Sequence, residues 1–265
     1  MLLCIDTGNT QTVIGLFDGP ELADHWRIAT VAERTADELA LMIQQCLGVH
    51  GFKPFAVGAG GTIEGDSQVT GVAISSGVPR VTAELREMTE RYFGFAALVL
   101  EPGIRTGMPI LYDNPKEVGA DRIANAVAAY DLYGGPSIVV DFGTANTIEA
   151  ISEKGEYLGG AIFPGIEISM DALFGRAAGL RRVELIPPKH VIGKSTVESI
   201  QSGSLYGFSA QVDGLVDRFE AELGTCTVIA TGGLAEQIIP HTRTVQHYEP
   251  WLTLKGLRII FERNQ

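Results

Sequence analysis

Short apolar runs alternate along this chain with longer stretches in which apolar residues recur at helical spacing. The short runs predict buried strands around residues 2–5, 72–74, 138–140 and 227–230. The longer stretches predict helices over residues 39–47, 82–92, 121–133, 166–180 and 252–261, and one or two helices over 197–219. Strands that alternate with helices in this way indicate an α/β fold.

Two of the predicted strands end in the same construction. In each, the apolar run ends in an aspartate (Asp6 or Asp141), a glycine follows two positions later, and a threonine follows six positions after the aspartate. The pattern predicts a strand, a tight turn and a returning strand, because glycine allows the tight turn and the close approach of a ligand. A carboxylate there could hold a cation, and the nearby hydroxyls could donate to phosphate oxygens. One such turn would be ordinary, but two in matching frame predict two related halves that bind a nucleotide's phosphates.

Other turn residues divide the rest of the chain. Asp18-Gly19 ends the predicted hairpin over residues 1–19, Lys154-Gly155 closes another, and Thr231-Gly232-Gly233 follows a strand as a third ligand-facing turn. Thr35-Ala36-Asp37-Glu38 has the form of a capping box at the start of the first helix. The glycine-rich stretch 57–79 contains the predicted strand 72–74.

Composition narrows the class of protein. The chain has 265 residues, of which 45% are hydrophobic and 20% charged, so it predicts a folded protein with a substantial core. Only a few apolar residues precede Asp6 and no basic residue flanks them, so we expect no signal peptide. No apolar stretch of the sequence is long enough to predict a membrane span. Three widely separated cysteines predict core thiols in a reduced, cytoplasmic protein. The net charge of −12 argues against a nucleic-acid partner but leaves an anionic ligand open, because turn amides act at contact.

Several familiar motifs are absent or incomplete. Gly193-Lys194-Ser195-Thr196 imitates the end of a Walker A loop, but Pro188 stands where that loop requires glycine. The five histidines have no metal-binding spacing, and neither a Gly-x-Gly-x-x-Gly nor a Gly-x-Ser-x-Gly motif occurs.

Gly119-Ala120-Asp121-Arg122 lies where a loop enters a helix and allows two interpretations. Asp121 is either a helix N-cap followed by a solvated arginine, or the acceptor of a proton from a substrate hydroxyl. In the second case Arg122 and the helix start would hold an anionic group.

In order and spacing, these motifs resemble those of the type III pantothenate kinases over nearly the whole chain. The resemblance rests on the two phosphate turns, the third turn and the motifs Gly119–Arg122, 159–165, Gly193–Thr196 and 256–264. It implies two similar actin-like, hexokinase-like (ribonuclease H-like) domains, 1–115 and 116–265, with ATP in the cleft between them; the last segment could pack back on the first domain. It also implies a homodimer that phosphorylates pantothenate with ATP in coenzyme A biosynthesis.

The resemblance assigns roles to individual residues. It implies that Asp121 is the general base and that Asp141 binds a monovalent cation (K⁺ or NH₄⁺). For the mechanism we add the hypothesis that Asp6 holds Mg²⁺ through water. The implied ATP contacts are Asp6, Thr7, Gly8, Asn9, Thr10, Gln11, Thr12, Val13 and Thr144. The implied pantothenate contacts are Tyr112, Gly119, Ala120, Asp121, Arg122 and Thr196, in a pocket completed near the dimer interface.

The chain departs from the family pattern at four positions, of which Ala210 and Gly77 do not touch the proposed chemistry, and other functions stay open. Asn146 and Glu149 stand in the second phosphate motif where the family usually has Thr and Asp. One alternative is a non-catalytic accessory protein like the Bvg accessory factors. The other is an actin-like-fold kinase or phosphatase that acts on a sugar, a polyphosphate or another small hydroxylated substrate.

Overall fold

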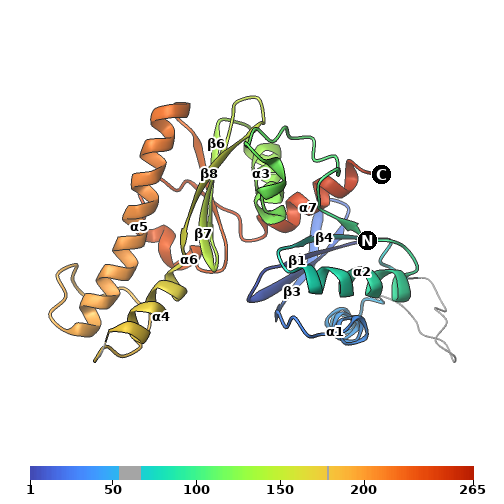
Figure 1. Ribbon diagram of the computed structural model, residues 1–265, viewed down its shortest axis with the longest axis horizontal. Helices are drawn as coiled ribbons and strands as arrows, with labels where there is room; N and C mark the ends of the chain where they lie inside the picture. Colours follow the sequence, from blue (N-terminus) through green and yellow to red (C-terminus); the bar gives the residue numbers. More distant parts are fainter. Residues whose placement is uncertain (54–66, 178) are drawn as a thin grey trace. The chain divides into compact units, whose positions relative to one another are not determined.

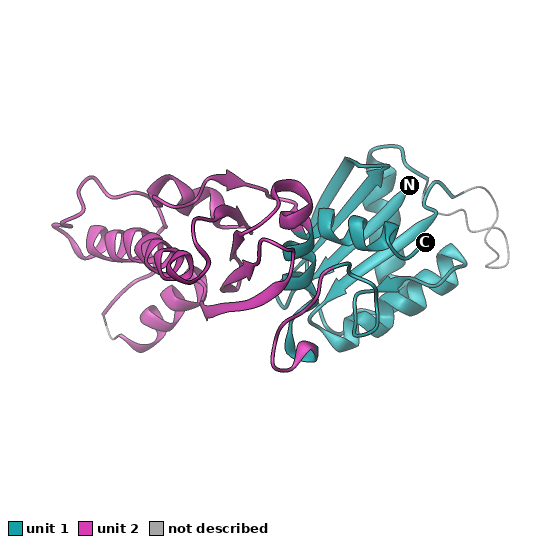
Figure 2. Ribbon diagram, turned by 90° about the horizontal axis from the view of Figure 1, so that it is seen from above, with its two compact units in different colours: residues 1–107, 116–127, 253–265 teal, residues 108–115, 128–252 magenta. Residues whose placement is uncertain are grey.

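The computed structural model describes residues 1–53, 67–177 and 179–265, and the chain forms two compact units. Unit 1 contains residues 1–107, 116–127 and 253–265, and unit 2 contains residues 108–115 and 128–252 (Figure 2). Helix α3 (Ala120–Tyr133) contributes residues to both units. The predicted domain boundary after residue 115 stays a prediction.

Unit 1 contains a five-stranded sheet in the order β3-β2-β1-β4-β5. Its strands are β1 (Leu2–Thr7), β2 (Gln11–Asp18), β3 (Glu21–Ala29), β4 (Gly71–Ser76) and β5 (Leu98–Val99). The first three strands form an antiparallel meander, whereas β4 runs parallel to β1 and β5 parallel to β4. The predicted hairpin over 1–19 and the strand at 72–74 are confirmed, while residues 54–66 of the glycine-rich stretch lie outside the described residues.

Helices α1 (Ala36–Val49) and α2 (Pro79–Phe93) pack against one face of this sheet (Figure 1). The predicted capping box begins α1: the Thr35 hydroxyl accepts from the Glu38 amide, and the Thr35 amide donates to the Glu38 carboxylate. Helix α7 (Leu252–Glu262) packs on strands β2 and β4, where Gly15 and Gly71 leave room for Leu254 and Phe261. The sheet is therefore covered by apolar side chains from helices far apart in the sequence.

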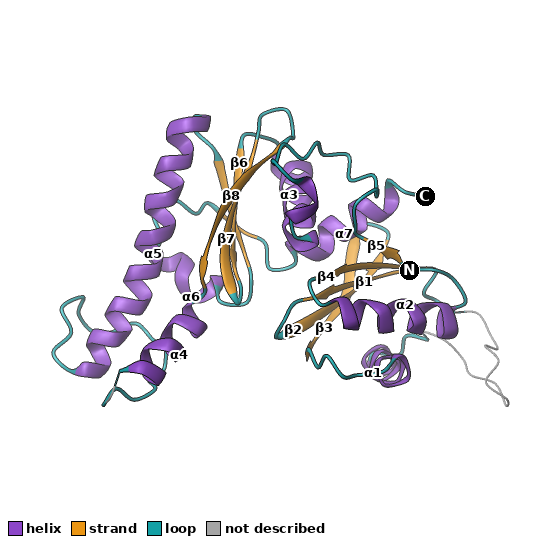
Figure 3. Cartoon of the chain, viewed as in Figure 1, coloured by secondary structure: helices purple, strands orange, loops and turns teal. Residues whose placement is uncertain are grey.

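Unit 2 repeats the topology of unit 1. Its sheet has the order β8-β7-β6-β9-β10, with β6, β7 and β8 antiparallel and β9 and β10 parallel to β6. Figure 3 labels β6, β7 and β8, which lie side by side in this sheet. The strands are β6 (Ser137–Phe142), β7 (Ala145–Ile151), β8 (Tyr157–Pro164), β9 (Thr227–Thr231) and β10 (His247–Tyr248). The repeat seen in two turns of the sequence thus extends to the whole strand order.

Unit 2 contains helices α4 (Ile166–Arg176), α5 (Thr196–Leu223) and α6 (Ala235–Ile238) and the 3₁₀ turn η2 (Ile239–His241). The 3₁₀ turn η1 (Pro115–Glu117), like α3, has residues in both units. The pattern over 197–219 forms one continuous helix, α5. The prediction that the preceding helix reaches residue 180 was wrong, because Ala177 adopts an extended backbone and Gly179 has a φ of +95°. No helix in the described part of the chain is long and apolar enough to cross a membrane.

Candidate active site

The first of the two predicted phosphate turns joins β1 to β2 in unit 1. The last strand pair is Thr7 with Thr12, and the Gly8 amide donates to the Gln11 carbonyl over 3.0 Å. Gly8, Asn9, Thr10 and Gln11 are exposed, so a ligand can approach the turn, although the Gly8 amide is already bonded within it. The turn predicted from sequence is therefore present with its polar groups on the surface.

A buried hydroxyl group lies beside the aspartate that precedes this turn. Asp6 in β1 pairs in register with Ser75 in the parallel strand β4, so the two side chains share a face of the sheet. Within the described residues, Ser75 Oγ is buried without a hydrogen-bond partner. An unsatisfied oxygen next to a carboxylate suits a hydrated cation, since water can donate to it while it binds the metal. The site thus fits the hypothesis of Mg²⁺ bound through water.

Ser75 was not identified from the sequence. It ends an apolar strand, as Asp6 does, but only the pairing of β4 with β1 brings these two residues together. The available signal was a polar residue at the carboxyl end of a predicted parallel strand, where ligands of α/β sheets commonly bind.

The second turn joins β6 to β7 in unit 2 and is closed by a third segment. The Gly165 amide at the start of α4 donates to the Thr144 carbonyl over 3.1 Å. A side chain at Gly165 would come within 2.4 Å of the Gly143 and Thr144 carbonyl oxygens, so only glycine fits there. Thr144 is exposed on this turn. Asn146 follows it with a fully buried amide that has no hydrogen-bond partner among the described residues.

Glycines surround the Asp141 carboxylate at the end of β6. Asp141 pairs with Thr231 in the parallel strand β9, and the following Gly232 has a φ of +97°. A Cβ at Gly232 would lie 2.5 Å from Asp141 Oδ1, and one at Gly143 would lie 3.7 Å from it. Backbone without side chains therefore approaches the carboxylate closely, which suits a cation held partly by carbonyl oxygens. The residues fit the implied monovalent cation, and the third predicted turn lies beside it.

Gly119–Arg122 forms the entry to α3, in unit 1. The helix begins at Ala120, so Asp121 is its second residue rather than the N-cap, and the N-cap interpretation was wrong. The exposed Asp121 carboxylate accepts a hydrogen bond from the Arg122 amide over 2.8 Å. A Cβ at Gly119 would lie 2.5 Å from Asp121 Oδ1, so glycine at that position leaves the carboxylate accessible. Arg122 is 7% exposed.

Tyr112 lies in unit 2, where its ring faces β8. The ring centroid is 6.3 Å from that of Tyr157, at an interplanar angle of 58°. Gly159 has a φ of +123°, and a Cβ there would lie 3.4 Å from the Tyr112 ring.

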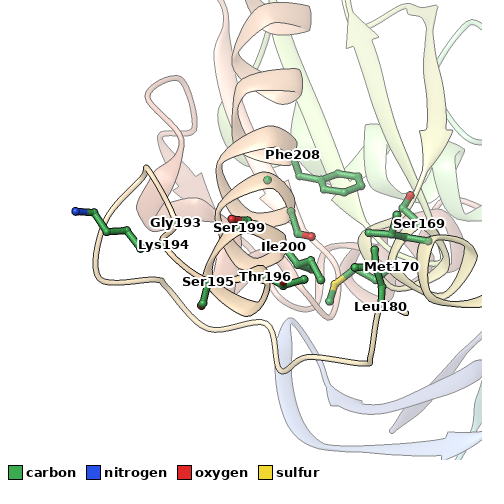
Figure 4. A pocket seen from close by; sticks show the side chains of 13 residues that line it. Ser169, Met170, Leu180, Gly193, Lys194, Ser195, Thr196, Ser199, Ile200 and Phe208 are labelled. Carbon is green, nitrogen blue, oxygen red and sulfur yellow. The ribbon is translucent and has the colours of Figure 1, made fainter. Parts of the chain in front are cut away.

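Thr196 lies elsewhere in unit 2, at the first residue of α5. It lines an open pocket of about 920 Å³ between α4 and α5, which Tyr112 does not line (Figure 4). Ser195 caps the helix by accepting from the Glu198 amide over 3.2 Å, and a Cβ at Gly193 would lie 2.5 Å from the Ser199 amide nitrogen. The Walker-like motif is therefore a tight entry to a helix.

Thiol chemistry is disfavoured at all three cysteines. Burial raises the pKa of Cys226 to about 11, and burial also raises the pKa of Cys4 and Cys46 above the ordinary value. Each is a free thiol that stays protonated at neutral pH. In residues 1–53, 67–177 and 179–265, no group of three or more His, Cys, Asp or Glu side chains is placed so that it could hold a metal ion.

Comparison with known proteins places the chain among kinases of one type. A profile of the family described as type III pantothenate kinase matches residues 2–218. The type III pantothenate kinase of Streptomyces griseus is 56% identical over 269 residues, covering 100% of this chain and 98% of the relative. That of Moorella thermoacetica is 52% identical over 265 residues, covering 100% of both chains.

Solved structures with little sequence identity share the fold. Component A of the (R)-2-hydroxyglutaryl-CoA dehydratase of Acidaminococcus fermentans aligns with a TM-score of 0.59 at 14% identity, covering 100% of this chain and 99% of that one. The activator of the 2-hydroxyisocaproyl-CoA dehydratase of Clostridium difficile, solved with bound ADPNP, aligns with a TM-score of 0.53 at 10% identity, covering 99% and 95%. The predicted actin-like, two-domain α/β ATPase fold is confirmed.

Proposed function

The chain belongs to the type III pantothenate kinase family, and from this premise we propose which of its residues carry the reaction. The enzyme transfers a phosphoryl group from ATP to pantothenate in coenzyme A biosynthesis. The observation that carries this function is 52–56% identity, over the whole chain, with enzymes of that name. These relatives do not favour the accessory-protein or sugar-kinase alternatives.

The two strand-ending turns bind the ATP phosphates. In unit 1, Gly8 lets the backbone approach the phosphates, and the amides and side chains of Asn9 and Thr10 donate to phosphate oxygens. Asp6 would hold Mg²⁺ through water. In unit 2, Thr144 donates from the second turn, and Asp141 would hold K⁺ or NH₄⁺. Cations held by Asp6 and Asp141 would supply positive charge near the phosphates, which is most of what phosphoryl transfer requires of a protein besides positioning.

Asp121 accepts the proton of the pantothenate primary hydroxyl. As that proton leaves, the hydroxyl oxygen forms a bond to the γ-phosphorus of ATP and the bond to the ADP oxygen breaks, so that 4'-phosphopantothenate and ADP are formed. The exposed position of Asp121, with glycine beside it, supports this role, because a base must reach the substrate directly.

The remaining pantothenate contacts come from four backbone or side-chain groups. Arg122 and the amides at the start of α3 hold the pantothenate carboxylate, since a helix N-terminus and a guanidinium both favour an anion. Tyr112 packs along its pantoyl part, and Thr196 contributes a hydroxyl. We also propose a homodimer located in the cytoplasm, where free thiols persist.

A coupled assay tests the function. Purified protein is given ATP with Mg²⁺ and K⁺, and ADP release is followed with and without pantothenate, while mass spectrometry identifies the product. We expect ADP release to depend on pantothenate and the product to be phosphopantothenate. ADP release that is equal without pantothenate, or that depends on a sugar instead, would exclude this function.

A further inference from the structure

A buried hydrogen bond lies behind the proposed substrate residue Tyr112. Tyr157, the first residue of β8, donates its phenol hydroxyl to Glu149 Oε2 in β7. Both side chains are 0% exposed. Burial removes the hydrogen bonds that a carboxylate and a phenol would make to water. The bond between Tyr157 and Glu149 compensates for part of that loss, so breaking it would be costly.

Tyr157 also holds the segment that leads into Tyr112. Its amide donates to the Pro109 carbonyl over 2.9 Å, and its carbonyl accepts from the Leu111 amide over 2.8 Å. Its ring lies against that of Tyr112, with the centroids 6.3 Å apart. Tyr157 therefore fixes both the backbone before Tyr112 and one side of the Tyr112 ring.

Two adjacent glycines make room for this arrangement. Gly160 pairs in register with Glu149, and a Cβ there would lie 2.9 Å from Glu149 Oε2 and 2.0 Å from the Ile148 carbonyl oxygen. A Cβ at Gly159 would lie 3.4 Å from the Tyr112 ring. The glycine pair thus accommodates the carboxylate on one side and the substrate-facing ring on the other.

We propose that Glu149 is a positioning residue for pantothenate: through Tyr157 it fixes the Tyr112 ring in the orientation that binds the substrate. The inference rests on the proposed contact between Tyr112 and pantothenate. The length of the Glu149 side chain is part of the argument, since a carboxylate one methylene shorter would not reach the Tyr157 hydroxyl from the same backbone position.

Steady-state kinetics of Glu149→Asp, Glu149→Gln, Tyr112→Ala and the double variant Tyr112→Ala/Glu149→Asp test the proposal. We expect Glu149→Asp to raise the KM for pantothenate about 5- to 20-fold and to leave the KM for ATP within about twofold. Glu149→Gln keeps the length and an acceptor oxygen, so it should stay close to the parent. In the Tyr112→Ala background, Glu149→Asp should add nothing further, because the two residues act as one unit.

Ile148→Val is the matched control. It removes one methylene from the neighbouring residue of β7, which faces the opposite side of the sheet and is also fully buried. It should lower thermal stability without changing the KM for pantothenate. The positioning role would be overturned if Glu149→Asp left the KM for pantothenate unchanged. It would also be overturned if Glu149→Asp raised this KM as much in the Tyr112→Ala variant as in the parent. Neither result would affect the proposed function. An unchanged KM in Tyr112→Ala itself would instead remove the proposed contact on which it rests.

Discussion

At the scale of single residues, Asp6 and Asp141 occupy equivalent places in the two units but have different neighbours. Each ends a central strand and pairs in register with a hydroxyl residue of the next parallel strand, Ser75 or Thr231. The buried, unsatisfied Ser75 hydroxyl lies beside Asp6, whereas Gly232 brings bare backbone to Asp141. A hydroxyl that can accept from metal-bound water suits a small, strongly hydrated cation, and close backbone suits a larger, weakly hydrated one.

Asp121→Asn tests the general base. Asparagine keeps the size of the side chain and can accept from the Arg122 amide, so thermal stability and ATP binding should change little. It cannot take the proton at neutral pH, and we expect kcat to fall by roughly 10²- to 10⁴-fold. Asp37→Asn is the control, because Asp37 is likewise exposed and is the second residue of helix α1. A comparable kcat in both variants would exclude Asp121 as the base.

The cation prediction concerns Asp141. Activity in buffers whose only monovalent cation is sodium or a bulky organic ion should fall well below that in potassium or ammonium. Asp141→Asn should weaken the response to potassium, since the amide carries no charge. Steady-state rates measured at constant ionic strength would show this dependence on the monovalent cation. Equal rates of the parent enzyme in all buffers would contradict the role of Asp141.

At the scale of elements, the caps of α1 and α5 perform the same local task in different settings. Thr35 and Ser195 both accept from the amide three residues later and so satisfy one of the free amides at the helix start. The cap of α5 also fixes Thr196, the next residue, at the edge of the pocket shown in Figure 4. Loss of either cap should therefore lower the free energy of unfolding by a similar amount. Only loss of the α5 cap should change the KM for pantothenate.

Ser195→Ala and Thr35→Ala form the matched pair. Each should lower the free energy of unfolding by about 1 kcal/mol, measured by chemical denaturation. Only Ser195→Ala should raise the KM for pantothenate, by roughly threefold, because Thr196 loses its fixed position. Ser195→Asp keeps an acceptor and should restore both values. If Thr35→Ala raised the KM equally, the effect would be one of general stability.

At the scale of the whole molecule, exposed apolar side chains gather in unit 2 around α4 and the entry to α5. Leu173 on α4 is 40% exposed, and Val191, Ile192 and Val197 near the start of α5 are 65%, 80% and 48% exposed. Apolar side chains grouped in this way commonly mark a protein interface. A symmetric homodimer would bury the same patch on both subunits.

Ile192→Asp should weaken the proposed dimer. A charge introduced into an apolar interface must be desolvated without a partner, so the equilibrium should shift toward monomer, seen by sedimentation at several concentrations. Val49→Asp is the control, because Val49 is 77% exposed on α1 of unit 1. A parent protein that sediments as a fully active monomer at assay concentration would contradict the dimer.

The sequence by itself determined the elements whose pattern is local. The spacing of apolar residues predicted α1, α2, α3, α5 and α7, the Thr35 capping box and both phosphate turns, because periodicity and turn chemistry depend on neighbouring residues. The motifs of the sequence were also enough to predict the family and the candidate site residues. Strand β3 (Glu21–Ala29) was not predicted, since half of its residues are exposed and its strand state comes from pairing with β2.

Only the tertiary structure decided which distant residues meet. The common strand order of the two units, Ser75 beside Asp6 and Gly232 against Asp141 all come from parallel pairing between strands far apart in the chain. The bond between Tyr157 and Glu149 depends in the same way on the register of β7 and β8. Register fixes which side chains share a face and which lie opposite one another, and no local pattern specifies it for residues so far apart.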